Sequence, residues 1–412
     1  MFAVLGVKNL LFVSIAFPPK NDPECIQTAR YFYYLNQTKQ FNVTVVTSKR
    51  PTLYMPEDTS LQKYGTDSKD FMEISIIENR YLNYFLRKIG LGKFLFPDSK
   101  MNFHWQWKRV VQRLKYKPDV IYSRSNPMSS AFMARKLKRH YKCPWIMHLS
   151  DPWALSPLHE FSEKDRIHYL ATEQSIIAEA DVITFTTEQT KALYQLQYPK
   201  EANKFHVFPN VYDPQEITSH PKPMDKKLRI VYTGGLGGKR SVFFLEEVLN
   251  LLRRRLPAYH EKIEFIFAGD VDRKNKQFFG KDLAGIKHVG LLSYADAKEL
   301  CQTARLLLVV DNPTKPTDAI YFPSKVLDYF LSKRKIWAVT PQNSATRDVL
   351  VGYPHAAFEH TDIEAMVQFL LRSVEELKTD GEYFQVNNLP ERFSAQQNAE
   401  KLAQLISGVV RS

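Results

Sequence analysis

The segment V-Y-T-G-G-L-G-G-K-R, residues 231–240, has four glycines within five residues and ends in two cations. It lies between a strand-like run and a helical pattern, so its amides and a helix's positive end should face one point, as phosphate sites require. Thr233 stands where a Walker loop begins with glycine, and Arg240 stands where the dinucleotide fingerprint has its third glycine. We therefore predict a different phosphate cradle, with a plain glycine turn as the alternative. Its residues are Gly234, Gly235, Gly237 and Gly238, with Arg240 as the charge.

A second candidate is Y-F-P-S-K-V-L-D, residues 321–328. Pro323 and Ser324 are typical of a helix start, where free amides point outward. Lys325 could then meet phosphate, while Asp328, one turn further along the same side, could accept both hydroxyls of a ribose. The alternative is a capped amphipathic helix without a ligand.

In the first half of the chain, P-W-I-M-H-L-S-D-P-W places His148 and Asp151 at the carboxyl end of a strand. Asp151 is the stronger candidate for a polar contact, since a lone histidine such as His148 is more often a core or rim residue. The segment F-P-P-K-N-D, residues 17–22, ends the first strand-like run. Parallel strands end at one edge of a sheet, so Pro19, Lys20 and Asn21 should face the same edge.

The 412 residues suffice for two domains, and short apolar runs alternate with helical patterns almost throughout. This alternation predicts an α/β protein with two tandem doubly wound, Rossmann-like domains facing a central cleft. We expect the first domain at residues 1–212 and a linker with three prolines at 213–227. The second domain should span 228–385, and a C-terminal helix at 386–412 should pack back toward the first.

The net charge of +13 is concentrated in one region, because residues 80–142 contain 16 Lys and Arg against two acids. Aromatic residues alternate with these cations up to residue 117, a pattern that suits an anionic membrane surface or a nucleic-acid backbone. A solvated basic face is the alternative. The three dispersed cysteines indicate a reduced, cytoplasmic protein without a metal site, and neither a signal peptide nor a membrane span is expected.

The ordered motifs together resemble the GT-B glycosyltransferases of family 4. They are F-P-P, D-P-W, F-P-N-V-Y-D, Y-T-G-G-L, H-V-G-L-L-S-Y-A-D-A-K-E-L and F-P-S-K-V-L-D-Y-F-L. The resemblance implies transfer of a sugar from a nucleotide-sugar donor with retention at the anomeric carbon and without an essential metal. It puts the donor in the second domain and the acceptor in the first. Arg240 would contact the diphosphate, Asp328 the ribose, and the backbone from Val289 to Leu291 the base.

Three positions depart from the family pattern. Gly235 replaces the first diphosphate-binding arginine, for which Lys239 or Lys325 could substitute. Ile320 stands at the first acid of the family's acidic pair, with only Asp318 near, and Ser150 replaces a histidine before Asp151. We count Arg240, Lys325 and Asp151 as the catalytic candidates.

The expected function is a retaining, hexosyltransferase-type enzyme that uses a donor such as a UDP- or GDP-sugar. The acceptor would be a lipid-linked saccharide in cell-surface polysaccharide or glycolipid synthesis. Residues 80–117 would dock the protein on the inner face of the membrane, near anionic lipid. A sugar-nucleotide epimerase of the same fold and a nucleotide-sugar-binding protein without turnover are the alternatives. A nucleic-acid partner is disfavoured, because the phosphate loop and the charge excess lie in different domains.

Overall fold

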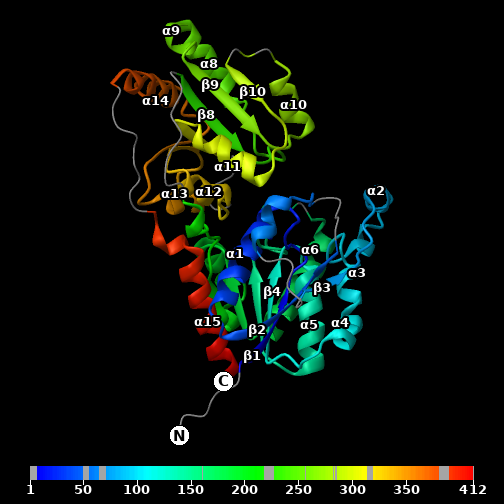
Figure 1. The fold of residues 1–412 in the computed structure, drawn as a ribbon. Helices are drawn as coiled ribbons and strands as arrows, with labels where there is room; N and C mark the ends of the chain where they lie inside the picture. Colours follow the sequence, from blue (N-terminus) through cyan, green and yellow to red (C-terminus); the bar gives the residue numbers. More distant parts are fainter. Residues whose placement is uncertain are drawn as a thin grey trace. The chain divides into compact units, whose positions relative to one another are not determined.

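The computed structural model describes residues 7–49, 55–64, 71–159, 161–217, 227–255, 257–281, 283, 285–312, 319–379 and 389–411. The chain divides into two compact units, each built around one parallel sheet (Figure 1). The first unit comprises Met1–Val211 and Arg392–Ser412, and the second comprises Tyr212–Glu391.

The first unit contains a seven-stranded sheet in the order β3-β2-β1-β4-β5-β6-β7. Its strands are β1 (Lys8–Val13), β2 (Phe41–Ser48), β3 (Phe71–Ile74), β4 (Val120–Ser125), β5 (Trp145–Leu149), β6 (Val182–Phe185) and β7 (Phe205–Val207). All neighbouring strands are parallel. Strand order reverses between β1 and β4, so the loops after these two strands diverge and leave a switch point at the carboxyl edge.

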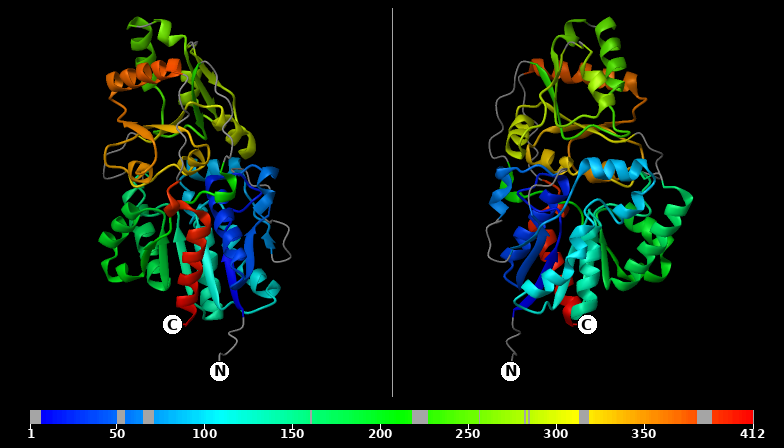
Figure 2. Two further views of the ribbon diagram at one scale, coloured as in Figure 1. Left: turned by 60° about the vertical axis from the view of Figure 1, so that its left-hand side comes forward. Right: turned by 90° about the vertical axis from the view of Figure 1, so that its right-hand side faces the viewer.

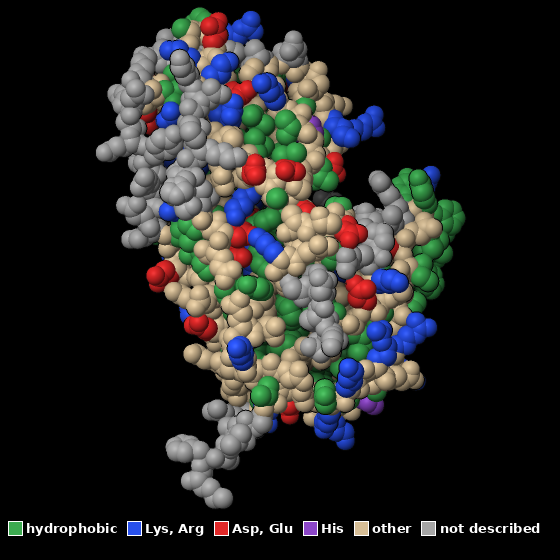
Figure 3. Space-filling view, in the orientation of Figure 1, with side chains coloured by type: hydrophobic (Ala, Val, Ile, Leu, Met, Phe, Trp, Pro, Cys, Tyr) green, Lys and Arg blue, Asp and Glu red, His purple; other side chains and the backbone are tan. Residues whose placement is uncertain are grey.

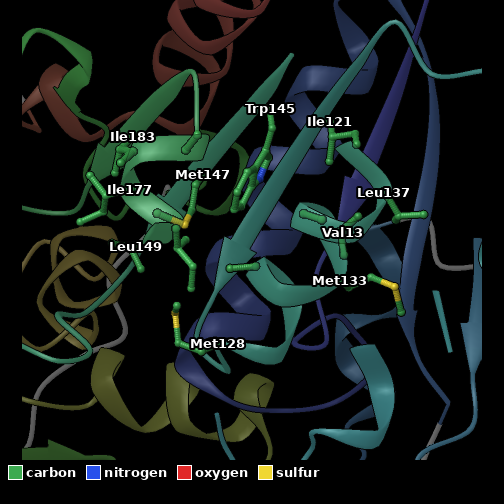
Figure 4. Packing of buried hydrophobic residues seen from close by; sticks show 14 of the residues in the cluster. Val13, Ile121, Met128, Met133, Leu137, Trp145, Met147, Leu149, Ile177 and Ile183 are labelled. Atoms are coloured by element: carbon green, nitrogen blue, oxygen red, sulfur yellow. The ribbon is translucent and has the colours of Figure 1, made fainter. Parts of the chain in front are cut away.

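Helices cover both faces of this sheet because successive strand residues point to opposite sides. Leu11, Trp145 and Met147 pack against α5 (Ser129–Tyr141) and α6 (Glu163–Glu179) (Figure 4). Leu10, Phe12 and Ile146 pack on the other face, against α1 (Pro23–Gln37) and α15 (Ala395–Arg411). Figure 2 shows α15, in red, beside this sheet, so the C-terminal helix belongs to the first unit. The remaining helices are α2 (Arg80–Lys88), α3 (Asn102–Trp105), α4 (Trp107–Arg113) and α7 (Glu188–Gln197).

The second unit contains a six-stranded parallel sheet in the order β10-β9-β8-β11-β12-β13, with its switch point between β8 and β11. Its strands are β8 (Leu228–Thr233), β9 (Ile263–Ala268), β10 (Ile286–His288), β11 (Leu306–Val310), β12 (Lys335–Val339) and β13 (His355–Phe358). Its helices are α8 (Phe244–Arg255), α9 (Pro257–His260), α10 (Arg273–Phe279), α11 (Tyr294–Gln302), α12 (Lys325–Leu331), α13 (Ala345–Leu350) and α14 (Ile363–Glu375). The two doubly wound parallel sheets confirm the predicted fold class.

Two local features differ from the sequence expectation. The edge strand β13 was not foreseen, because H-A-A-F is short and partly exposed and lacks the alternating pattern of a strand. The glycine-rich segment does not lead directly into a helix: α8 begins only at Phe244, after an irregular loop over residues 234–243. The positive end of α8 therefore does not coincide with the glycines.

Candidate functional site

The glycine loop is fixed against the neighbouring strand β9 by a direct backbone contact. Gly269 follows β9 with φ +138°, and a Cβ built on it would lie 2.3 Å from the carbonyl oxygen of Gly234. Gly234 itself has φ +106°. Only glycine at residue 269 allows this approach, and glycine adopts both positive φ values without strain. The sequence thus brings the loop to the carboxyl edge of the sheet.

Alternate N–H groups of the loop donate hydrogen bonds within the protein. The N–H groups of Gly234 and Leu236 donate to the carbonyls of Ala268 and Asp270, at 2.8 Å and 2.9 Å. The Gly238 N–H donates to Asp272 Oδ2 at 3.2 Å. The Arg240 N–H donates within the loop as well. The predicted cradle is therefore only half available: the intervening amides, of Gly235 and Gly237, are those that could donate to a phosphate.

Lys325 begins α12 and extends its side chain to this loop. Its Nζ lies 3.6 Å from the centroid of the Tyr232 ring and 2.9 Å from where a Gly234 side chain would begin. The residue is half-buried, yet its ammonium is out of reach of solvent and has no hydrogen-bond partner among the described residues. Burial, and next the nearby charge of Arg240, hold the pKa of Lys325 well below its ordinary value.

Arg240 and Asp311 complete a group of three ionisable side chains around the switch point. Arg240 Nε is also buried without a partner in the described part of the chain. Asp311 directly follows β11 and accepts a hydrogen bond of 2.7 Å from the Thr340 hydroxyl. Burial raises the pKa of Asp311, against the attraction of Arg240 and Lys325. Arg240 and Lys325 thus share one buried carboxylate, a charge arrangement that favours an anionic ligand.

Asp328 lies one turn beyond Lys325, in a separate polar contact. The Tyr294 hydroxyl donates to Glu216 Oε2 at 2.6 Å and lies 3.3 Å from Asp328 Oδ1. Glu216 also pairs with Lys298 at 3.6 Å. Ser324 precedes the helix as its N-cap, but its side chain makes no capping hydrogen bond.

The segment after β10 carries two exposed apolar side chains, Val289 and Leu291. The Gly269 N–H donates to the Gly290 carbonyl at 2.7 Å, so this segment lies next to the glycine loop's own contact point. Val289 and Leu291 on either side are 48% and 67% exposed. Apolar side chains left in water beside a backbone edge suit the face of a base.

The carboxyl edge of the first unit carries Asp151 as its most exposed candidate. Asn126 Nδ2 donates to Asp151 Oδ2 at 3.3 Å. Desolvation of the carboxylate by surrounding protein atoms raises the pKa of Asp151 to about 6, and the nearby charges of Glu24 and Asp22 act in the same direction. The residue itself remains exposed. Asp151 can therefore accept a hydrogen bond or a proton near neutral pH.

The other predicted residues of this edge are mostly held inside the unit. Lys20 is 1% exposed, and its ammonium donates to the Thr47 hydroxyl at 3.2 Å and to the carbonyl and hydroxyl of Ser48 at 2.8 Å and 3.0 Å. His148 is fully buried and contacts the Thr184 hydroxyl at 2.9 Å. Burial keeps the pKa of His148 well below its ordinary value. Both side chains support the edge from within, so neither is presented to a ligand.

Pro19 and Asn21 anchor the loop between β1 and α1. The Pro19 carbonyl accepts from the Asp58 N–H at 2.6 Å. The Asn21 amide donates to Asp58 Oδ2 at 2.9 Å. Asn21 is half-buried, so its side chain remains partly accessible.

Comparison with known proteins gives a family resemblance for the first half of the chain. A sequence model of Glycosyltransferase Family 4 matches residues 34–216, which lie almost wholly in the first unit. The chain resembles the glycosyltransferases of family 4. Among curated proteins, none matches the sequence significantly.

Solved structures show the same fold at low identity. HepE from Anabaena, in complex with UDP-glucose, matches with a TM-score of 0.62 and 12% identity, over 97% of this chain and 99% of that one. A glycosyltransferase from Rickettsia africae gives 0.61 and 12%, over 99% and 100%. Sucrose-phosphate synthase from Thermosynechococcus elongatus gives 0.60 and 13%, over 98% and 96%. The chain therefore has the GT-B fold.

The structure adds residues to which the sequence analysis assigned no role. Asp311 could have been found, because a polar residue directly after a buried parallel strand lies at the edge where ligands bind. Tyr294 and Glu216 carry no such signal, since only the fold brings them to Asp328. Of the departures from the family pattern, Ile320 is buried at 6% exposure and Asp318 lies outside the described residues.

The described residues were compared with the requirements of a metal site and of a membrane span. No cluster of three or more His, Cys, Asp or Glu side chains with the geometry of a metal site occurs among the described residues. Within the same residues, no helix is long and apolar enough to cross a membrane.

Proposed function

We propose that the protein is a retaining glycosyltransferase that binds a nucleoside diphosphate sugar at the switch point of its second unit. The observation that carries this proposal is the buried Lys325 ammonium, which touches the glycine loop and Tyr232 without an acceptor. Arg240 adds a second cation there. The family 4 resemblance and the UDP-glucose bound by HepE support the same class of reaction.

In this mechanism the cations act on the leaving group. Cleavage of the bond between the sugar and the diphosphate leaves negative charge on the β-phosphate. Arg240 and Lys325, fixed in a site of low dielectric, stabilise that charge more in the transition state than in the ground state. They supply the charge that a metal ion would otherwise provide, so we propose a reaction without an essential metal.

The rest of the donor would extend along the edge of the sheet. We assign the ribose hydroxyls to Asp328, whose carboxylate lies 3.3 Å from the Tyr294 hydroxyl. We assign the base to the exposed segment at Val289 and Leu291. These contacts are made equally before and during the reaction, so they should affect donor binding rather than turnover.

On the acceptor side, we assign Asp151 a polar contact with the attacking hydroxyl. Its support is the pKa of about 6, which lets the carboxylate accept a proton near neutrality. The leaving phosphate can also take this proton on the same face of the sugar, so Asp151 need not be the sole base. That donor and acceptor sites face each other across a cleft stays a prediction.

We further propose that the acceptor is a lipid-linked saccharide and that α2 rests on an anionic membrane surface. Tyr81, Tyr84 and Phe85 of α2 are 85%, 67% and 55% exposed, and Phe94 just beyond is 56% exposed. Figure 3 shows hydrophobic side chains gathered at this edge of the first unit and Lys and Arg side chains below them. The exposed cations are Lys88, Lys108, Arg109, Arg113, Lys115 and Lys117.

The structure narrows the set of residues available for this contact. Phe96, within the predicted docking region 80–117, packs on Trp153 with ring centroids 5.5 Å apart. Arg135 and Arg139 pair with Glu179, so part of the charge excess is neutralised within the protein. Each remaining cation near an anionic surface could still contribute about 1 kcal/mol.

The membrane contact is tested by vesicle sedimentation. Binding of the wild type should rise with the content of anionic lipid and weaken with salt. Tyr81→Ser combined with Phe94→Ser should reduce binding, whereas Leu196→Ser, at an 84% exposed residue of α7, should not. Absence of binding to anionic vesicles at low salt would refute the membrane contact and favour a soluble acceptor.

Activity is tested by incubating the protein with a panel of nucleotide sugars, beginning with UDP-glucose and GDP-mannose, and measuring released nucleotide. Release that requires an acceptor, with the product anomer determined by NMR, supports a retaining transferase. Conversion of the sugar without an acceptor would indicate an epimerase. Tight binding without any conversion would indicate a binding protein.

A further inference from the structure

The charge balance around Lys325 is uneven in the empty donor site. Among the described residues, Asp311 is the carboxylate whose charge favours the charged form of Lys325, and it also attracts Arg240. With Arg240 and Asp311 both ionised, their charges cancel. A protonated Lys325 would then add one uncompensated positive charge to a buried region, which is costly.

The remaining groups around the ammonium bring no negative charge that would balance it. Tyr232 from β8 offers its ring face at 3.6 Å, a cation–π contact that attracts an ammonium without neutralising it, and burial raises the pKa of the Tyr232 hydroxyl to about 12. Cys301 from α11 contacts Thr233, and burial likewise raises the pKa of its thiol to about 12. Asp328 on α12 interacts with Tyr294. Near neutral pH, neither the Tyr232 hydroxyl nor the Cys301 thiol supplies a negative charge.

A diphosphate placed against the glycine loop would reverse this balance. It brings two or three negative charges to the atoms that now surround Lys325 Nζ, and its oxygens supply the acceptors that the ammonium lacks. An opposite charge at such a distance favours the charged form of a lysine strongly.

We infer that Lys325 is an uncharged amine in the empty site and takes up one proton from solvent when a nucleoside diphosphate binds. The amine becomes an ammonium, and no other bond changes. This inference rests on the proposed donor site and goes further, because it couples donor binding to pH. Affinity is then highest where Lys325 is readily protonated and falls as pH rises.

The test is calorimetric titration of the full-length protein with UDP, and with GDP and ADP in parallel. It is run from about pH 8 upward, where the terminal phosphate and histidines have already lost their protons. In buffers of different ionisation enthalpy, the slope of the binding enthalpy gives the number of protons taken up. We expect a slope close to one and an affinity that falls about tenfold per pH unit within this range.

Two variants assign the proton to Lys325. Lys325→Met should bind more weakly and with a slope near zero. Lys325→Arg should retain binding, also with a slope near zero, because a guanidinium stays charged throughout this range. Thermal unfolding verifies that both variants are folded. If Lys325→Met does not fold, Lys325→Arg alone still tests whether the proton binds at Lys325.

The outcomes separate the two proposals. Nucleotide binding with no proton uptake by the wild type, or with equal uptake by the Lys325 variants, overturns this inference and leaves the donor site intact. Failure of all three nucleotides to bind overturns the donor site together with it.

Discussion

The two units use buried cations at the carboxyl edges of their sheets in opposite ways. In the first unit, the Lys20 ammonium donates to three oxygens of Thr47 and Ser48. In the second unit, Lys325 Nζ has no hydrogen-bond partner among the described residues. A buried cation whose partners are all in the protein supports structure, whereas one without them is poised for an anion from outside.

The largest effect should come from Arg240. Arg240→Ala should lower kcat/KM for the nucleotide sugar roughly 30- to 1000-fold, because it removes a fixed hydrogen-bond donor to the developing charge. The corresponding loss of transition-state stabilisation is about 2–4 kcal/mol. Lys142→Ala, at an exposed lysine at the end of α5, should leave turnover unchanged. Equal activity of Arg240→Ala and the wild type would remove Arg240 from the mechanism and weaken the contrast between the units.

The close contact of Gly234 with Gly269 should be nearly as sensitive. Gly269→Ala places a Cβ 2.3 Å from the Gly234 oxygen, so the loop must move. We expect a loss of about 1–3 kcal/mol in the free energy of unfolding, together with weaker donor binding. Gly235→Ala is the matched control, because its Cβ would lie 3.7 Å from the nearest heavy atom, the Asp270 oxygen. Similar unfolding curves for both variants would show that the contact is not tight.

The contrast itself is tested by the same substitution in each unit. Lys20→Met strands the oxygens that now accept from the ammonium, so it should cost about 1–3 kcal/mol of stability. Lys325→Met should instead raise the free energy of unfolding by about 0.5–2 kcal/mol while weakening donor binding. If both variants lose stability alike, the two lysines have the same structural role.

The pH dependence gives the sign of this second effect. The folded-state pKa of Lys325 is lowered, so the unfolded chain binds more protons between that value and about pH 10.4. Wild-type stability therefore rises with pH across this window, and the advantage of Lys325→Met should shrink toward high pH. Urea unfolding of both proteins at several pH values measures the difference.

The smallest effect is expected at the ribose contact. Asp328→Asn should weaken nucleotide binding by about 1 kcal/mol and leave kcat nearly unchanged, because the contact is uniform along the reaction. Tyr294→Phe should act in the same direction, since it removes the hydroxyl that lies 3.3 Å from the Asp328 carboxylate. A fall in kcat with unchanged KM would place Asp328 in the chemical step instead.

Much of the fold was predictable, because buried parallel strands have short continuous apolar sequences, such as L-L-L-V-V before Asp311. The site was predictable only in part. Arg240 follows from its place after a strand and Lys325 from its place at a helix start, but the pairing state of a cation depends on contacts distant in sequence. Lys20 and Lys325 look alike in the sequence and differ only in which oxygens the fold brings to them.

The central claim, that the switch point of the second unit binds a nucleoside diphosphate, is tested most directly by a crystal structure of the protein with UDP. The account predicts phosphate oxygens within hydrogen-bond distance, about 3 Å, of Lys325 Nζ and the Arg240 guanidinium. The same density should place the ribose at Asp328. UDP bound elsewhere, with Lys325 still facing only the Tyr232 ring, would contradict the claim.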